Sequence, residues 1–197
     1  MAYFPFFIDI EEANGLIIGG GKQVLGKIEK LLHYKPKLRV ITAEALDAVK
    51  EIAEKNEVLI EFREFQDSDL EPRPDFVIIA CDDMEERKRI AGICRDRHIL
   101  VNSVDDVENC EFIFPSLIQR GKLSIGVMIG GASPVIGMDI KRQIEELLPD
   151  NIEEILEQME MIRPEMKEKY PDEKERAKIF RMIYERMMKK SSFYGLL

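Results

Sequence analysis

The chain has 197 residues, of which 45% are hydrophobic and 34% are charged, the balance of a globular rather than a disordered protein. Its 29 basic and 38 acidic residues give a net charge of −9, which disfavours general binding to nucleic acid. No apolar run reaches the roughly 18–20 residues that a membrane span needs, and the first residues lack a signal-peptide pattern, so we expect a cytoplasmic protein without membrane contact.

Short apolar runs alternate with helical stretches through the first 112 residues. The predicted strands are 16–18, 38–41, 58–65, 76–80 and 99–102, and the predicted helices are 24–33, 44–55 and 84–97. The run at 76–80 is wholly apolar, as expected where helices cover both faces of a parallel sheet. The alternation predicts an α/β fold with a Rossmann-like, doubly wound parallel sheet over residues 1–112.

After residue 105, the regular alternation of predicted strands and helices ends. Two strands, 112–117 and 123–128, are predicted on either side of a turn, and Ser133 is placed to cap a helix from Pro134 to about Leu148. Two further amphipathic helices, around 152–162 and 179–187, complete the chain. We therefore expect a small α+β dimerisation segment over 113–148 and a helical C-terminal subdomain over 149–197.

Cysteine and histidine are scarce. Cys81, Cys94 and Cys110 are too far apart to form a C-x-x-C pair, and His33 and His98 are the only histidines. This inventory predicts reduced thiols and no resident metal site.

The predicted turn Gly19, Gly20 and Gly21 follows the first strand and opens a helix, which is the setting of a dinucleotide-binding fingerprint. Glycines there let the backbone approach a pyrophosphate, whose charge is stabilised by free N–H groups and by the helix end. The third fingerprint position, normally Gly or Ala, is Val24. A plain strand–helix connection is the alternative, and we favour cofactor binding.

An acid about 20 residues after the glycine turn is expected to bond the adenosine ribose. Glu44, just past the second strand, is the candidate, and an acid in the N-cap region of the next helix is an equal alternative. A 2′-phosphate would need a basic residue there, but Arg39 lies within the strand, so NAD is favoured over NADP.

Three predicted loops leave the carboxyl ends of parallel strands and should converge: 19–21, 81–83 and 103–106. In the second loop, Cys81 and Asp82 are candidate cofactor contacts, whereas Asp83 is better explained as a helix cap. Asp105 follows a strand and precedes no clear helix. Its carboxylate could accept a proton as hydride leaves a substrate carbon, and the alternative is an acid that braces the loop.

Several short motifs occur in order along the chain: Gly19–Gly21 with Lys27, then 80–83, 101–106, 112–115 and 130–135. Together they resemble the precorrin-2 dehydrogenase / sirohydrochlorin ferrochelatase family, which also forms the front part of siroheme synthase. The resemblance covers about residues 3–149.

The resemblance implies NAD-dependent oxidation of precorrin-2 to sirohydrochlorin and a homodimer built through the middle segment. In some members it also implies insertion of Fe²⁺ or Co²⁺. The family's catalytic aspartate falls on Asp105, and its cofactor contacts fall on Lys22 and Gln23 and on Ala43 and Glu44.

Precorrin-2 carries many carboxylates, and 113–148 is the one segment with more basic than acidic residues, by a single charge. The candidate substrate-binding residues there are Arg120, Lys122, Ser133, Lys141 and Arg142. For each basic residue, an ordinary surface charge is the alternative.

The chain departs from the family pattern at Val24, Gly26, Cys81, Met128 and Ile129. Hydroxyl residues usually stand at the last two positions, which places metal insertion in doubt but leaves Asp105 untouched. Two other functions are alternatives: an NAD-sensing regulatory module without catalysis, and a metallochelatase with a vestigial dinucleotide fold. The glycine turn fits a sensor equally well, whereas the Asp105 loop and the motifs after it favour the dehydrogenase.

Overall fold

The computed structural model describes residues 3–130 and 133–194. The chain divides into two compact units, the first comprising Phe4–Ile113 and the second beginning at Phe114. Among the helices within the described residues, none combines the length and apolar composition needed to cross a lipid bilayer.

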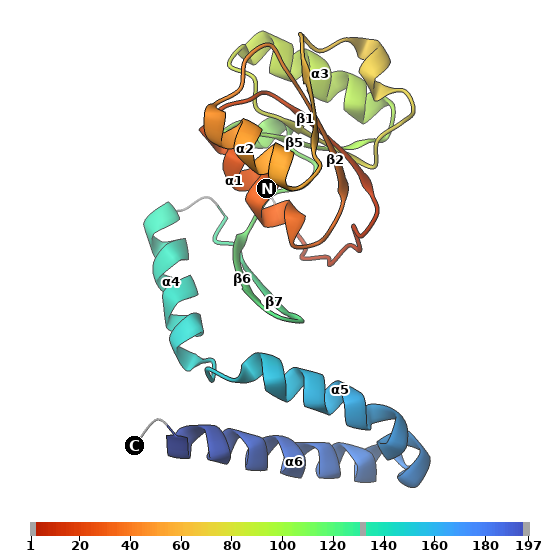
Figure 1. Ribbon diagram of the computed structural model, residues 1–197, viewed down its shortest axis with the longest axis vertical. Helices are drawn as coiled ribbons and strands as arrows, with labels where there is room; N and C mark the ends of the chain where they lie inside the picture. Colours follow the sequence, from red (N-terminus) through yellow and green to blue (C-terminus); the bar gives the residue numbers. More distant parts are fainter. Residues whose placement is uncertain (1–2, 131–132, 195–197) are drawn as a thin grey trace. The chain divides into compact units, whose positions relative to one another are not determined.

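A five-stranded parallel sheet forms the centre of the first unit (Figure 1). Its strands are β1 (Asn14–Ile18), β2 (Lys37–Thr42), β3 (Leu59–Phe62), β4 (Phe76–Ile79) and β5 (Leu100–Ser103). They are ordered β3-β2-β1-β4-β5, so the chain starts in the middle and builds outwards in both directions. This order is that of a doubly wound dinucleotide-binding sheet.

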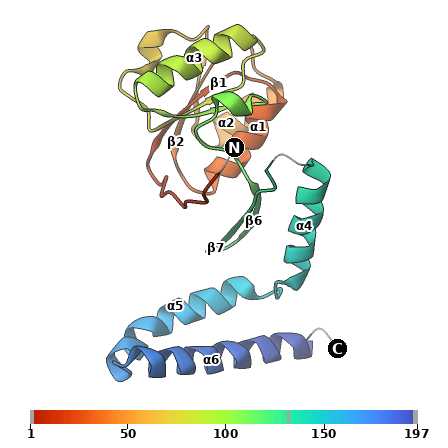
Figure 2. The ribbon, with the colours of Figure 1, turned by 180° about the vertical axis from the view of Figure 1, so that it is seen from behind.

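Three helices cover the two faces of this sheet. They are α1 (Lys22–Leu32), α2 (Asp47–Lys55) and α3 (Met84–Asp96). Figures 1 and 2 show α1 and α2 together on one face and α3 on the other. The expected α/β fold with a doubly wound parallel sheet is therefore confirmed.

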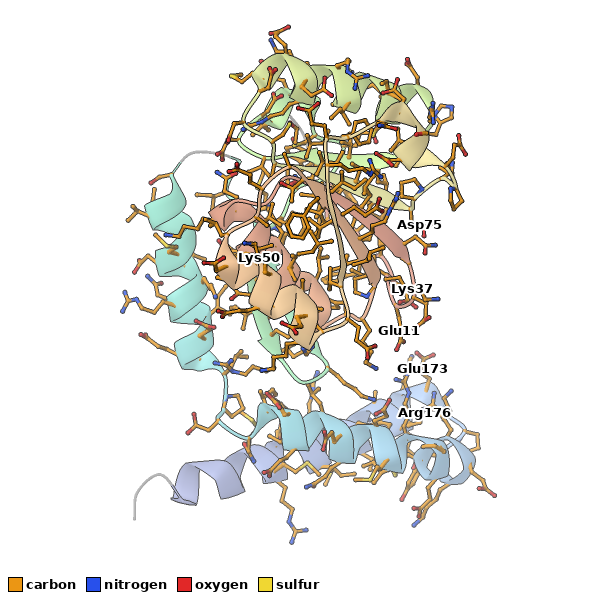
Figure 3. The ribbon with its side chains drawn as sticks, turned by 45° about the horizontal axis from the view of Figure 1, so that its top comes forward. Glu11, Lys37, Lys50, Asp75, Glu173 and Arg176 are labelled. Atoms are coloured by element: carbon orange, nitrogen blue, oxygen red, sulfur yellow. The ribbon has the colours of Figure 1, made fainter. Side chains whose placement is uncertain are left out.

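The core of the first unit is formed by the middle strands and by the inner sides of the helices. All four residues of β4 are buried, because helices cover both faces of the sheet. Val24 of α1 is fully buried, so the large residue at the third fingerprint position packs into this core. Lys37 and Asp75 lie at the amino ends of β2 and β4, and Figure 3 shows them with Glu11 on one side of the unit.

The second unit consists of a hairpin and three helices. Its elements are β6 (Ser116–Arg120), β7 (Leu123–Val127), α4 (Pro134–Leu147), α5 (Ile152–Lys169) and α6 (Glu173–Tyr194). The two strands pair antiparallel, α4 packs on β6, and α5 and α6 lie side by side (Figure 1). The helical C-terminal part expected from the sequence is present.

Several expected boundaries were wrong. Helix α2 begins at Asp47 rather than at residue 44, and α5 continues through Pro164 to Lys169. The segment 112–115 is not a strand, and β6 begins at Ser116. Ser133 is the N-cap residue of α4 as expected, but its side chain makes no capping hydrogen bond. Gly131 and Ala132 of the adjoining motif lie outside the described residues.

Candidate active site

The candidate site lies at the carboxyl edge of the sheet in the first unit. The order of the strands reverses about β1, with β2 on one side and β4 on the other. In open α/β sheets, ligands bind at the carboxyl edge beside such a reversal. The turn after β1 and the loop after β4 are therefore adjacent there, and the loop after β5 follows next to them.

Neighbouring backbone atoms leave no room for a side chain at the first two glycines of the turn. Gly19 has a φ of 121°, and a Cβ there would lie 2.5 Å from the carbonyl oxygen of Ala80. A Cβ on Gly20 would lie 2.2 Å from the carbonyl oxygen of Glu44. Because these positions leave no room for a side chain, the turn holds the loops after β1, β2 and β4 in close contact.

Gly21 differs from its two neighbours. It is the N-cap residue of α1, it is exposed, and a Cβ built on it would meet no atom within 4 Å. The first amides of a helix have no partner within the helix, and the helix dipole favours an anion at that end. Gly21 therefore borders open space beside an end of α1 that is suited to phosphate.

An open pocket of about 830 Å³ occupies this edge of the sheet, a size within the range of small-molecule sites. Seven of the predicted cofactor residues line it: Gly19, Gly20, Gly21, Ala43, Glu44, Cys81 and Asp82. Lys22 and Gln23 do not belong to this lining. The pocket also has residues that the sequence analysis did not single out, among them Arg63, Glu64 and Phe65.

Glu44 lies in the segment that connects β2 with α2. The carbonyl of Glu44 accepts a hydrogen bond of 2.6 Å from the hydroxyl of Thr42, and the amide of Leu46 donates to the carbonyl of Gly20 at 3.0 Å. Leu46 is the N-cap residue of α2. Glu44 therefore lies two residues before this N-cap, and its alternative role, an acid in the N-cap region of α2, stays a prediction. Its predicted bond to a ribose also stays a prediction.

Arg63, just after β3, is bound by acidic side chains. Its guanidinium donates to both carboxylate oxygens of Asp69, at 2.8 and 2.6 Å, and to Glu61 at 2.6 Å. The hydrogen bond from Arg63 holds the pKa of Asp69 below its usual value. The position of Arg63 at this edge could have been predicted, because loops that follow parallel strands meet at one edge of the sheet. No pattern in the neighbouring sequence predicts that Arg63 pairs with Asp69.

Asp105 stands on a loop whose backbone is fixed on both sides. The residue itself adopts a left-handed conformation, φ 60°, which aspartate tolerates better than most residues. The amide of Val104 donates to the carbonyl of Ile79 at 2.8 Å, and the carbonyl of Val104 accepts from Arg87 at 2.8 Å. Arg87 also donates to the carbonyl of Cys81, so it joins the loops after β4 and β5.

The Asp105 side chain is exposed and contacts the glycine-turn side of the site. Its Oδ2 accepts a hydrogen bond of 2.5 Å from the side-chain amide of Gln23, in the first turn of α1. Within the same loop, Asp106 accepts from Asn109 at 2.8 Å and from Ser103 at 3.4 Å. The structure thus brings the predicted acid and one predicted cofactor residue into direct contact.

Lys27 lies one helical turn after Gln23 on α1. Partial burial lowers the pKa of its ammonium group to about 8, although the negative charges of Cys110 and Asp105 act in the opposite direction. A lysine in this state can release a proton near neutral pH.

The cysteines are poorly suited to act as thiolates. Burial raises the pKa of Cys94 to about 11 and also raises the pKa values of Cys81 and Cys110. Across residues 3–130 and 133–194, no group of three His, Cys, Asp or Glu side chains is placed to hold a metal ion.

The candidate substrate residues all belong to the second unit, and the four basic ones face acidic partners there. Lys122 pairs with Glu160, and Arg142 pairs with Asp139 and Glu146. Arg120 and Lys141 both approach Glu145, at 4.0 and 3.9 Å. Such exposed pairs contribute little stability and exchange partners easily. Ser133 is half-buried at the start of α4.

Comparison with known proteins places the chain among dinucleotide-binding proteins. The family model described as "Putative NAD(P)-binding" matches residues 6–116. The chain is 31% identical to a siroheme synthase of Pseudoalteromonas atlantica, over 86% of this chain and 37% of that protein. It is 30% identical to a siroheme synthase of Acinetobacter baylyi, over 98% of this chain and 42% of that protein. The chain therefore spans about two fifths of the length of these relatives.

A solved structure of SirC, a precorrin-2 dehydrogenase, superposes with a TM-score of 0.71. The superposition covers 98% of this chain and all of that chain, at 16% sequence identity. At that identity the likeness shows a shared fold, which extends through both compact units.

Proposed function

Because the chain belongs to the NAD(P)-binding family whose model spans residues 6–116, we propose that it is an NAD-dependent dehydrogenase that oxidises precorrin-2 to sirohydrochlorin. The observation that carries this proposal is the contact between Asp105 and Gln23, which places a carboxylate beside the predicted dinucleotide turn. The match of nearly the whole chain to siroheme synthases supports the choice of a tetrapyrrole substrate within siroheme biosynthesis.

The residues at the carboxyl edge fit a dinucleotide. Gly21 and the first amides of α1 would hold the pyrophosphate, and Glu44 would bond the adenosine ribose, with Ala43, Cys81 and Asp82 along the same pocket. Glu44 and Glu64 line the pocket, and Arg63 there is already engaged by Asp69 and Glu61. The 2′-phosphate of NADP would therefore lie near acidic side chains, and the guanidinium of Arg63 would not be available to bind it. This arrangement favours NAD over NADP.

In the proposed reaction, the substrate loses a hydride and a proton. When bound, NAD⁺ supplies the acceptor for the hydride and its electron pair. Asp105 receives the accompanying proton on its carboxylate, directly or through one water, and so prevents positive charge from accumulating on the macrocycle. The fixed backbone on either side of Asp105 keeps this carboxylate at the edge of the site.

Substrate binding and assembly belong to the second unit in this proposal. Arg120, Lys122, Lys141 and Arg142 would exchange their present acidic partners for substrate carboxylates. We also propose a homodimer, because α4 exposes apolar side chains at Val135, Met138 and Leu147, and exposed apolar surface favours association. Sedimentation of the protein as a monomer at micromolar concentration would contradict the dimer.

The test is an anaerobic reaction of the protein with NAD⁺ and enzymatically prepared precorrin-2, followed by the absorbance of NADH and of sirohydrochlorin. We expect both products to appear in equal amounts. NAD⁺ binding without either product would support the NAD-sensing module instead. Addition of Fe²⁺ or Co²⁺ after oxidation is complete then tests metal insertion as a separate activity.

A further inference from the structure

We propose that Gln23 is a positioning residue that holds the Asp105 carboxylate in its reactive orientation, an inference that rests on the dehydrogenase function proposed above. The side-chain Nε2 of Gln23 donates to Oδ2 of Asp105 at 2.5 Å, across 82 residues of sequence. Gln23 belongs to the first turn of α1, two residues after the last glycine of the turn, whereas Asp105 follows β5. One side chain thus connects the dinucleotide turn with the proton acceptor.

The backbone alone does not orient the Asp105 side chain. Its preceding residue, Val104, is buried and bonded through both its amide and its carbonyl. The Asp105 side chain, by contrast, is exposed, and within the described parts of the chain Gln23 makes the one hydrogen bond recorded to its carboxylate. An exposed carboxylate without such a donor samples several rotamers, so Gln23 decides which one is held.

The amide is also the right kind of donor for this task. A glutamine amide donates hydrogen bonds but stays uncharged, because it does not ionise at ordinary pH. It therefore occupies Oδ2 and leaves Oδ1 of the same carboxylate to receive the substrate proton. The charged groups that share this neighbourhood are Lys27 on α1, Asp106 in the same loop and the titratable thiol of Cys110.

The first experiment separates orientation from cofactor binding. Gln23→Met keeps the length of the side chain but removes the donor, and we expect kcat to fall roughly 10-fold. The KM for NAD⁺ should change less than kcat, because the Gln23 side chain is bonded to Asp105 and does not line the pocket. Gln23→Glu places a second carboxylate against Asp105 and should lower kcat further at pH 8. As the pH falls, the pair takes up one shared proton and the donor is restored. As the pH falls, the kcat of Gln23→Glu divided by that of the wild type should therefore rise. The same ratio for Gln23→Met should not change with pH.

Gln143→Met is the matched control, because Gln143 donates to Asp139 at 2.8 Å in an exposed pair of the same kind on α4. We expect its kcat and pH profile to match those of the wild type. Unchanged kcat in Gln23→Met, or a Gln23→Glu ratio that does not vary with pH, would overturn the proposal.

A second measurement does not depend on activity. In ¹H–¹⁵N spectra of the full chain, Asp105→Ala should shift the side-chain amide resonances of Gln23, whereas Asp106→Ala should leave them in place. If the wild type forms no NADH from precorrin-2, the dehydrogenase function fails, and these spectra still decide whether Gln23 holds Asp105. Gln23 resonances that are unmoved in Asp105→Ala would refute the contact itself.

Discussion

Three consecutive glycines in the turn after β1 have two different structural roles. Gly19 and Gly20 lie against the backbone of neighbouring loops, with no space for a methyl group. Gly21 borders open space, so its missing side chain matters only when a ligand approaches. A fingerprint that looks uniform in the sequence therefore combines two positions that packing restricts to glycine with one position that borders open space.

Alanine substitutions should separate these roles. Gly20→Ala should destabilise the protein by about 2 kcal/mol or more, because its Cβ would meet the carbonyl of Glu44. Gly21→Ala should leave the free energy of unfolding within roughly 0.5 kcal/mol of the wild type and weaken NAD⁺ binding. Urea unfolding and calorimetric titration with NAD⁺ measure the two quantities. A Gly21→Ala protein that binds NAD⁺ with wild-type affinity would remove the turn from the cofactor site.

Some residues of the candidate site could be predicted from the sequence, but the contacts between them could not. Asp105 and the glycines could be predicted because each follows a strand at a position that the alternation of elements defines. The contact of Gln23 with Asp105 could not, since it depends on how helix α1 and the loop after β5, 82 residues apart, meet. The pairing of Arg63 with Asp69 could not be predicted either, because Asp69 lies on a separate short helix.

At the scale of elements, the strands and helices were predictable while several of their ends were not. Hydrophobic periodicity marked every strand of the parallel sheet. It could not show that α2 begins only at Asp47, because the preceding extended segment is held by Gly20 through a tertiary contact. Similarly, 112–115 has the composition of a strand, but only the segment from Ser116 finds a pairing partner in β7.

An ion-pair cluster connects two strands with a short helix in the first unit. Arg39 on β2 and Arg63 after β3 both bond Glu61, and both contact Asp69 of the helix η1 (Asp67–Leu70). Asp69 is 6% exposed, so its charge depends on these partners.

Asp69→Asn should lower the free energy of unfolding by about 2 kcal/mol at pH 7, because a charged hydrogen bond in a buried position is lost. The native pKa of Asp69 is lowered, so this stabilisation is present above the pKa of the unfolded chain and disappears as the pH falls through the native value. The difference between variant and wild type should therefore shrink below about pH 4.

Asp67→Asn provides the control on the same short helix, since Asp67 forms an exposed pair with Arg89. Its effect should stay within roughly 0.5 kcal/mol at every pH. Urea unfolding between pH 3 and pH 7 measures both variants, and equal losses in the two would contradict the role of burial.

At the scale of the whole molecule, the proposed activity is divided between two compact units. The proton acceptor and the dinucleotide pocket belong to the first unit, and the predicted substrate bases belong to the second. The alternation of strands and helices predicted the first unit well. In the second unit, helical spacing could predict the pairs that Lys141 and Arg142 form within α4. It could not predict the pair of Lys122 with Glu160, which joins separate elements.

The central claim is that Asp105 accepts a proton beside a dinucleotide bound at the glycine turn. Asp105→Asn tests it most directly, with single-turnover formation of NADH from precorrin-2 measured anaerobically and NAD⁺ affinity measured in parallel. We predict a rate lower by roughly 10²-fold or more with the affinity for NAD⁺ nearly intact. A near-normal rate in this variant, with the wild type active, would contradict the account.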